Sequence, residues 1–126
     1  MPAYLNGFSD LEHSSTQPEK AKAFYQGLFG WKMKDEQIPG YGTRTEISTD
    51  DGPGGSIMPG AEGEPARWMV YIDVKDVRAT LAKVEALGGK VLKGATHIPH
   101  AGTLAVVLVP TVAAFKIWQP EYALEE

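Results

Sequence analysis

The sequence contains no cysteine, so the chain can form no disulfide bond and can offer no thiolate for catalysis or metal binding. A lack of disulfides fits a reducing compartment, and we expect a cytoplasmic protein. Basic residues are also in the minority, since 12 Lys and Arg stand against 16 Asp and Glu for a net charge of −4. A chain with this charge has no basic footprint, so we expect no nucleic-acid partner.

The sequence also lacks any apolar run long enough to cross a bilayer, so we expect no membrane partner. Its first residues do not follow the basic-then-apolar pattern of a signal peptide. What it does have is the length of one domain, 126 residues, with 43% hydrophobic residues and many turn formers, Gly 14 and Pro 9.

One stretch occurs twice in the chain. The first copy runs from Ser15 to Trp31 and the second from Val74 to Lys90, and their alignment sets Gly30 against Gly89. Each copy has helical spacing of apolar residues, a turn-forming entry and a glycine exit. Segments on both sides of each copy have the composition of strands. The repeat therefore predicts an α+β chain made of two strand-helix-strand-strand-strand modules.

The expected modules span about residue 5 to about 58 and about residue 67 to about 120. A breaker-rich stretch from about 59 to about 66 links them, and we treat residues 1–126 as a single domain. In the first helix, Ser15 or Thr16 is the expected cap. Four apolar positions at helical spacing are expected to face the sheet: Ala21, Phe24, Tyr25 and Leu28.

Two carboxylates stand two residues apart in the first predicted strand, from Gly7 to Ser14. Asp10 and Glu12 therefore point to the same side of that strand. Two interpretations have similar weight: a solvated strand face, or a pair of acids that line a cavity.

The segment Phe24-Tyr-Gln-Gly-Leu-Phe-Gly-Trp31 resembles the helix-to-strand signature of the vicinal oxygen chelate superfamily. That superfamily includes glyoxalases, bleomycin-resistance proteins and dioxygenases. Further resemblance lies in Trp68-Met-Val-Tyr-Ile-Asp-Val-Lys-Asp-Val77 and Phe115-Lys-Ile-Trp-Gln-Pro120, so nearly the whole chain is covered. The resemblance implies a glyoxalase-like fold of two βαβββ modules whose curled mixed sheets form a cleft. It is nearest to a glyoxalase-related branch of uncharacterised members.

Metal enzymes of the superfamily carry one ligand on the first and fourth strand of each module. By the resemblance, the matching positions are Asp10, Ser56 or Met58, Met69 and Lys116. A protonated lysine has no lone pair to give, and a thioether is a poor ligand for hard metals. One carboxylate is too few for a catalytic metal site. We therefore expect no metal and no other cofactor.

The inward positions of the cleft implied by the resemblance combine acids with aromatic and apolar side chains. Such a mixture suits a small organic ligand with an aromatic part and a polar group. Burial can make Glu12 or Asp10 a general acid or base, although Lys116 can equally serve only to balance a buried charge. Glu12 and Tyr71, at equivalent points of the two repeats, are the catalytic candidates. The ligand-binding candidates are Asp10, Met69, Lys116, Trp118 and His97.

The two histidines of His97-Ile-Pro-His100 are close in sequence and are expected in a loop. A transition-metal site would need further ligands that the nearby sequence does not supply, so surface histidines are the better interpretation. By the resemblance, this loop borders the cleft, which makes His97 a candidate for ligand contact. His13 points away from Glu12 and is expected to be structural.

Three classes of function remain open from the sequence. The first is a metal-free protein that binds a small organic ligand. The second is a lyase, isomerase or dioxygenase-type enzyme of the same superfamily, with or without a metal, and the nearest enzyme class is lactoylglutathione lyase. The third is a structural or regulatory module. Members of this length usually pair, so the resemblance also implies a homodimer.

Overall fold

The computed structural model describes residues 5–50 and 53–121. In these residues the chain forms two helices and eight strands. In chain order they are β1 (Phe8–Ser15), α1 (Pro18–Phe29), β2 (Lys32–Ile38), β3 (Gly42–Ser48), β4 (Gly55–Pro59), β5 (Arg67–Asp73), α2 (Val77–Ala86), β6 (Lys90–Ile98), β7 (Gly102–Leu108) and β8 (Ala114–Pro120).

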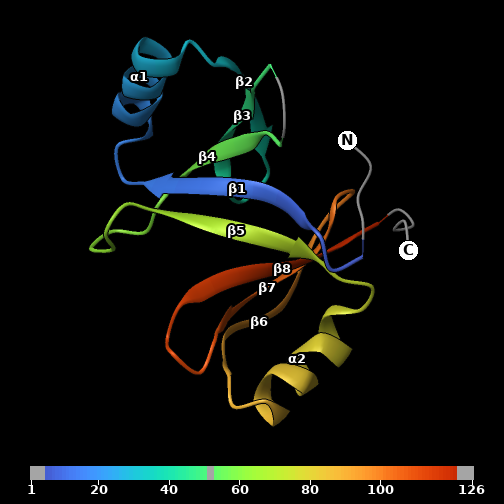
Figure 1. Ribbon diagram of the computed structural model, residues 1–126. Helices are drawn as coiled ribbons and strands as arrows, with labels where there is room; N and C mark the ends of the chain where they lie inside the picture. The colour runs from blue at the N-terminus through green and yellow to red at the C-terminus, as the bar shows by residue number, and fades with distance from the viewer. Residues whose placement is uncertain (1–4, 51–52, 122–126) are drawn as a thin grey trace. The chain divides into compact units, whose positions relative to one another are not determined.

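The chain divides into two compact units. The first unit is Asp10–Met69, and the second unit joins Met1–Ser9 to Val70–Glu126. Within the first unit the strand order is β2-β3-β4-β1, and within the second it is β6-β7-β8-β5 (Figure 1). In both, three strands pair antiparallel and the module's first strand joins parallel to its last. The predicted α+β fold with two βαβββ modules is therefore confirmed.

Helix α1 begins slightly later than a cap at Ser15 or Thr16 predicts. Its cap is Gln17, which makes no side-chain capping bond, and Pro18 opens the helix. The hydroxyl of Ser15 instead accepts a hydrogen bond from the Gln17 amide at 3.0 Å, which turns the chain ahead of the helix. The predicted exit is confirmed, since Gly30 ends α1 with φ of 67° in the left-handed region.

The predicted buried face of α1 is wrong in part. Ala21 and Tyr25 are half-buried, but Phe24 and Leu28 are exposed. The physical reason is that Tyr25 fills the space beside the helix: its ring stacks on Trp31 and meets His13 edge-on. With that ring in place, the neighbouring positions around the helix stay uncovered.

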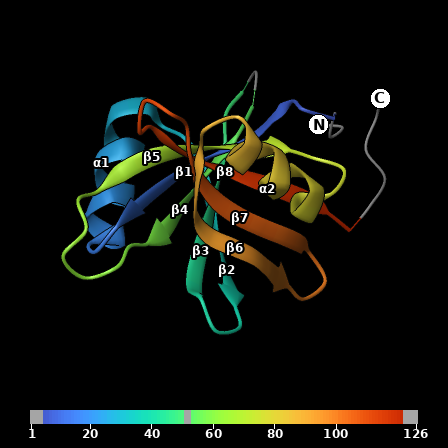
Figure 2. The same cartoon turned by 90° about the horizontal axis from the view of Figure 1, so that it is seen from below.

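Helix α2 lies within the second copy of the repeat, as the sequence predicts. Asp76 is its cap and accepts a hydrogen bond from the Ala79 amide at 3.1 Å. The helix packs against β6, β7 and β8 (Figure 2). Val77 at its start belongs to the buried core of the second unit, together with Val74, Ala105 and Ile117.

Strand β6 begins at Lys90, the last residue of the second repeat copy. It continues to Ile98 by shifting its register between Val91 and Lys93 and again between Lys93 and Thr96. These irregularities break the alternation by which a strand is recognised, and Gly94 in the middle resembles a strand end. His97 therefore lies in a strand, where it pairs with Thr103, and the prediction that it lies in a loop is wrong.

Candidate functional site

One face of the first unit's sheet is lined by polar side chains. Glu12 of β1 and Glu46 of β3 both have Ser56 of β4 as their Cα partner. Because cross-strand partners and alternate residues share a face, Asp10 and Arg44 lie on the same side. The opposite side carries α1, since His13 meets Tyr25 there. The polar face is therefore the face away from the helix.

Four side chains of this face form one network. The Ser56 hydroxyl donates to Asp10 Oδ2 at 3.0 Å. Arg44 approaches the same oxygen at 3.7 Å and donates to Glu36 Oε1 at 3.1 Å. The guanidinium of Arg44 thus stands between two carboxylates from different strands. We call Asp10, Glu36, Arg44 and Ser56 the Arg44 network.

The pKa of Asp10 is raised above its usual value. Burial of the carboxyl group is the main cause, and nearby Glu12 adds to it. The positive charge of Arg44 and the hydrogen bond from Ser56 act in the opposite direction without reversing it. Asp10 is therefore a carboxyl group that takes up a proton more readily than an exposed aspartate, which suits proton transfer.

The residues at the family's ligand positions can be compared with what a bound metal ion would require. In the first unit, the family ligand positions hold Asp10 and either Ser56 or Met58. Asp10 and Ser56 hydrogen-bond to each other while Arg44 supplies the positive charge. Across residues 5–50 and 53–121, no three His, Asp or Glu side chains gather as a metal would require. The remaining two positions, Met69 and Lys116, offer a thioether and an ammonium group. The residues present do not fit the metal of the family's enzymes.

The second unit brings three of the predicted residues together. Lys116 Nζ lies 5.3 Å from the centre of the Tyr71 ring, and the Tyr71 and Trp118 rings stack with centroids 6.3 Å apart. Tyr71 and Lys116 are direct partners of the parallel pair β5–β8, which fixes this arrangement. Ile72 and Ile117 alternate with them and point to the opposite side, where Ile117 joins the core. We call Tyr71, Lys116 and Trp118 the aromatic shelf.

Other predicted residues stand elsewhere. Glu12 is buried on the polar face of the first unit, and Met69 is buried at the end of that unit. His97 is exposed and its Nε2 contacts the Glu121 carboxylate at 2.5 Å, so its side chain ties β6 to the residue after β8. The catalytic role of Glu12 and the ligand-binding roles of Met69 and His97 therefore stay predictions.

His13 is buried beside Tyr25 and Trp68, and among the described residues its Nδ1 has no hydrogen-bond partner. Burial lowers the pKa of its imidazole, so the ring stays neutral in its aromatic surroundings. This fits the structural role expected from the sequence.

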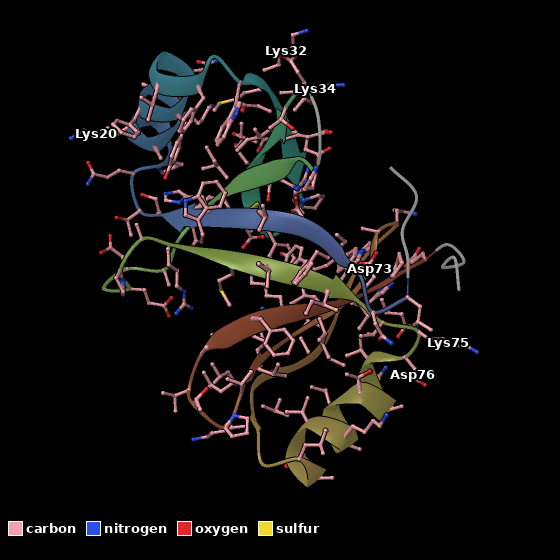
Figure 3. All side chains as sticks on the ribbon, viewed as in Figure 1. Lys20, Lys32, Lys34, Asp73, Lys75 and Asp76 are labelled. Atoms are coloured by element: carbon pink, nitrogen blue, oxygen red, sulfur yellow. The ribbon has the colours of Figure 1, made fainter. Side chains whose placement is uncertain are left out.

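Asp73 is a functional candidate that the sequence did not single out. It is the last residue of β5, only 1% exposed, and its Oδ1 finds no partner within residues 5–50 and 53–121. Burial raises the pKa of this carboxyl group, against a weaker effect of Ser9. Figure 3 shows it at the end of the strand, with Asp76 at the start of α2 and Lys75 extending outward. The one signal for Asp73 in the sequence is that it lies on the same strand face as the candidate Tyr71.

A hollow of about 380 Å³ lies on the helix side of the first unit, between α1 and β2. Lys22 spans it with contacts to Asp35 at 3.0 Å and Glu19 at 3.2 Å. The charged side chains that line this hollow are thereby paired with one another. The hollow lies on the other side of the sheet from the Arg44 network. The residues that line it are Glu19, Lys22, Ala23, Gln26, Met33 and Asp35.

Comparison with known proteins places this geometry in a family. Residues 14–110 match the model of the Glyoxalase/Bleomycin resistance protein/Dioxygenase superfamily. The chain belongs to that superfamily, as its helix-to-strand signature predicts.

Two curated relatives have informative names. A Mycobacterium tuberculosis protein named "Putative glyoxylase CFP32" is 39% identical over 114 residues, which cover 86% of this chain and 44% of the relative. The "Anthracycline biosynthesis protein DnrV" of Streptomyces peucetius is 32% identical over 115 residues, covering 76% of this chain and 40% of the relative. This chain therefore spans less than half the length of these relatives.

Solved structures show the same fold at low sequence identity. A hypothetical protein of Bacillus halodurans has a TM-score of 0.70 at 13% identity, and the match covers 95% of this chain and 98% of that protein's chain. The methylmalonyl-CoA epimerase of Mycobacterium tuberculosis has a TM-score of 0.68 at 10% identity, covering 97% and 93% in the same order. At these identities the likeness concerns the fold alone.

Neither helix within the described parts of the chain has the length and apolar character needed to cross a membrane. The cytoplasmic location expected from the lack of cysteine stays a prediction.

Proposed function

We propose that this protein binds a small organic ligand and does so without a metal ion. The observation that carries the proposal is the Arg44 network: Asp10 and Ser56, at two family ligand positions, share a hydrogen bond of 3.0 Å beside a guanidinium. The protein itself supplies the positive charge beside this hydrogen-bonded pair, through Arg44. The partly exposed carboxyl group of Asp10 and guanidinium of Arg44 remain within reach of the polar group of a ligand.

The aromatic shelf of the second unit supports an aromatic or otherwise flat ligand. Tyr71 and Trp118 offer stacked ring faces, and Lys116 adds a positive charge beside them. The Streptomyces relative is named for the biosynthesis of anthracyclines. A ligand screen should therefore include anthracyclines together with small aromatic acids and phenols.

An enzymatic role is the second candidate, and one observation favours it. The raised pKa of Asp10 suits a general acid or base in a lyase or isomerase. The name of the mycobacterial relative, a glyoxylase, points to the same class. Glu12, the base first expected, is buried on the same face and stays a candidate.

Two substitutions test the ligand site. We expect a ligand that binds at the polar face of the first unit to bind about tenfold more weakly to Glu12→Gln, which removes the charge and keeps the shape. We expect a ligand that binds at the aromatic shelf to bind about tenfold more weakly to Tyr71→Phe, which removes only the hydroxyl group. Affinities from calorimetry against the parent protein give the measurement. His100→Ala, an exposed position, is the matched control and should leave the affinity unchanged. Unchanged affinity in both Glu12→Gln and Tyr71→Phe would remove these residues from the site.

Metal content is tested separately. Elemental analysis after dialysis should find no stoichiometric Zn, Ni, Fe or Mn. A retained metal that is lost in Asp10→Asn would contradict the metal-free proposal.

We also propose that the chain pairs with a second copy through the exposed face of α1. Phe24, Leu28 and Phe29 are 63%, 58% and 56% exposed, and α1 has no buried residue. Large apolar side chains gathered on one helix mark an interaction surface. The resemblance implies a homodimer, so we take a second copy of the chain as the partner of this surface.

Sedimentation tests the pairing. We expect a dimer at micromolar concentration and a monomer after Phe24→Glu with Leu28→Glu, because a carboxylate is costly to bury in an apolar interface. Gln26→Glu, exposed on the same helix but about half a turn away from Phe24 and Leu28, is the control for added negative charge and should leave the dimer intact. A monomeric parent protein would overturn the proposal.

A further inference from the structure

Arg44 uses its guanidinium incompletely. In the described part of the chain it donates one hydrogen bond, to Glu36 at 3.1 Å. Its other terminal nitrogen is 3.7 Å from Asp10 Oδ2, which is an ion pair too long for a hydrogen bond. Arginine offers a planar fork of five donors that matches a carboxylate in two parallel bonds. Part of that fork is therefore available for a further acceptor.

The arginine is also within reach of a ligand. The side chain of Arg44 is 27% exposed and that of Asp10 is 17% exposed, whereas Ser56 behind them is fully buried. Glu36, the partner of Arg44 on the edge strand β2, is half exposed. An exposed ion pair of this kind contributes little to stability, so a carboxylate from outside can replace Glu36 at small cost.

We propose that Arg44 is the residue that recognises the ligand, and that it binds a carboxylate or enolate oxygen of a small organic anion, with Asp10 as the second contact. This inference rests on the proposed function and names the chemical class of its ligand. Glu36 acts as a built-in competitor that occupies the fork when the ligand is absent.

The charge of Asp10 is compatible with an anionic ligand. Burial raises the pKa of Asp10, and when Asp10 takes up a proton the negative charge 3.7 Å from Arg44 is lost. A protonated Asp10 keeps Oδ2 as the acceptor for Ser56 and can donate from Oδ1 to the ligand. The ligand oxygen would then have a charged donor on one side and a neutral donor on the other.

Benzoate and benzamide are suitable probes, because they share one shape and differ in charge. We expect the parent protein to bind benzoate about tenfold more tightly than benzamide, as measured by NMR shift titration. Arg44→Met should remove this preference, and Arg44→Lys should restore only part of it because lysine lacks the fork. Glu36→Gln should tighten benzoate binding several-fold and leave benzamide unchanged. Circular dichroism of each variant verifies that it is folded.

Arg78→Met is the matched control, since it removes an exposed guanidinium of α2 that belongs to neither candidate site. It should leave the benzoate preference in place if Arg44 is the recognition residue. A preference that persists in Arg44→Met, or that disappears in Arg78→Met as well, overturns the inference. Equal affinity of the parent for both probes, or binding of neither, overturns it as well. These outcomes leave the proposed ligand-binding function standing. That function fails only if the wider ligand screen also finds no ligand.

Discussion

Replacing Gly102 with valine should lower the free energy of unfolding by about 3 kcal/mol, with a fall in melting temperature of roughly 10 °C. Gly102 is buried at the start of β7, where it pairs with Pro120. A Cβ atom there would lie 2.3 Å from the Gln119 carbonyl oxygen and 2.8 Å from the Trp118 ring. Both distances are below contact, and the first neighbour is backbone that cannot rotate away.

Gly94→Val is the matched control for Gly102→Val. Gly94 lies in β6 of the same unit, and a Cβ there meets nothing within 4 Å. A β-branched residue suits a strand, so we expect a change within about 0.5 kcal/mol. Thermal melts of the two variants beside the parent protein give the comparison. Equal melting temperatures would show that the backbone around Gly102 can move to admit a side chain.

Replacing Asp73 with asparagine should stabilise the protein by about 1–3 kcal/mol near neutral pH. Asp73 is 1% exposed and its Oδ1 has no partner in the described residues, so its ionised form is costly to bury. Asparagine has nearly the shape of a protonated aspartic acid and carries no charge. The carboxylate should therefore make the parent less stable than the variant wherever the unfolded chain is ionised.

The pH dependence has a definite sign. The pKa of Asp73 is raised in the folded protein, so the folded state binds more protons than the unfolded state between the unfolded value and the folded value. The contribution of Asp73 to the free energy of unfolding therefore falls as the pH rises through that interval. The pKa of Asp10 is raised as well, and its effect on stability should be the same in the parent protein and in Asp73→Asn. The gain from Asp73→Asn should be full at about pH 8 and should vanish below about pH 4.

Urea unfolding at both pH values measures this difference. Asp76→Ala is the control, three residues further along: it removes a helix cap and should destabilise by about 1 kcal/mol at about pH 8. The substitutions at these two aspartates should thus change the free energy of unfolding in opposite directions. A loss of stability in Asp73→Asn at high pH would mean that the carboxylate is well paired.

Much of the fold could be predicted from the sequence. The repeat around Gly30 and Gly89 predicts two equivalent modules, each with one helix between strands. The face of α1 could not be predicted in full, because Phe24 and Leu28 have the spacing of buried residues and are exposed. Helical periodicity marks an apolar side and does not say whether the sheet or a partner covers it.

The site was predictable only in part. Asp10 and Ser56 follow from the family pattern, and the register of β1 and β4 brings them into contact. Arg44 was missed because an arginine in a strand rich in threonine has the appearance of a solvent-facing residue. Its contacts to Asp10 and Glu36 depend on the order β2-β3-β4-β1, which no local pattern in the sequence reports.

The parallel pairing of β1 with β4 has a consequence for synthesis of the chain. Strands β2, β3 and β4 follow one another and can pair as hairpins as they appear, but Asp10 must wait for Ser56, 46 residues later. At about 5–20 residues per second, that wait is roughly 2–9 s on the ribosome. During it β1 has no strand of its own module to join. The Arg44 network is thus the last part of the first unit to assemble, and no ligand can assist the chain before β4 has emerged.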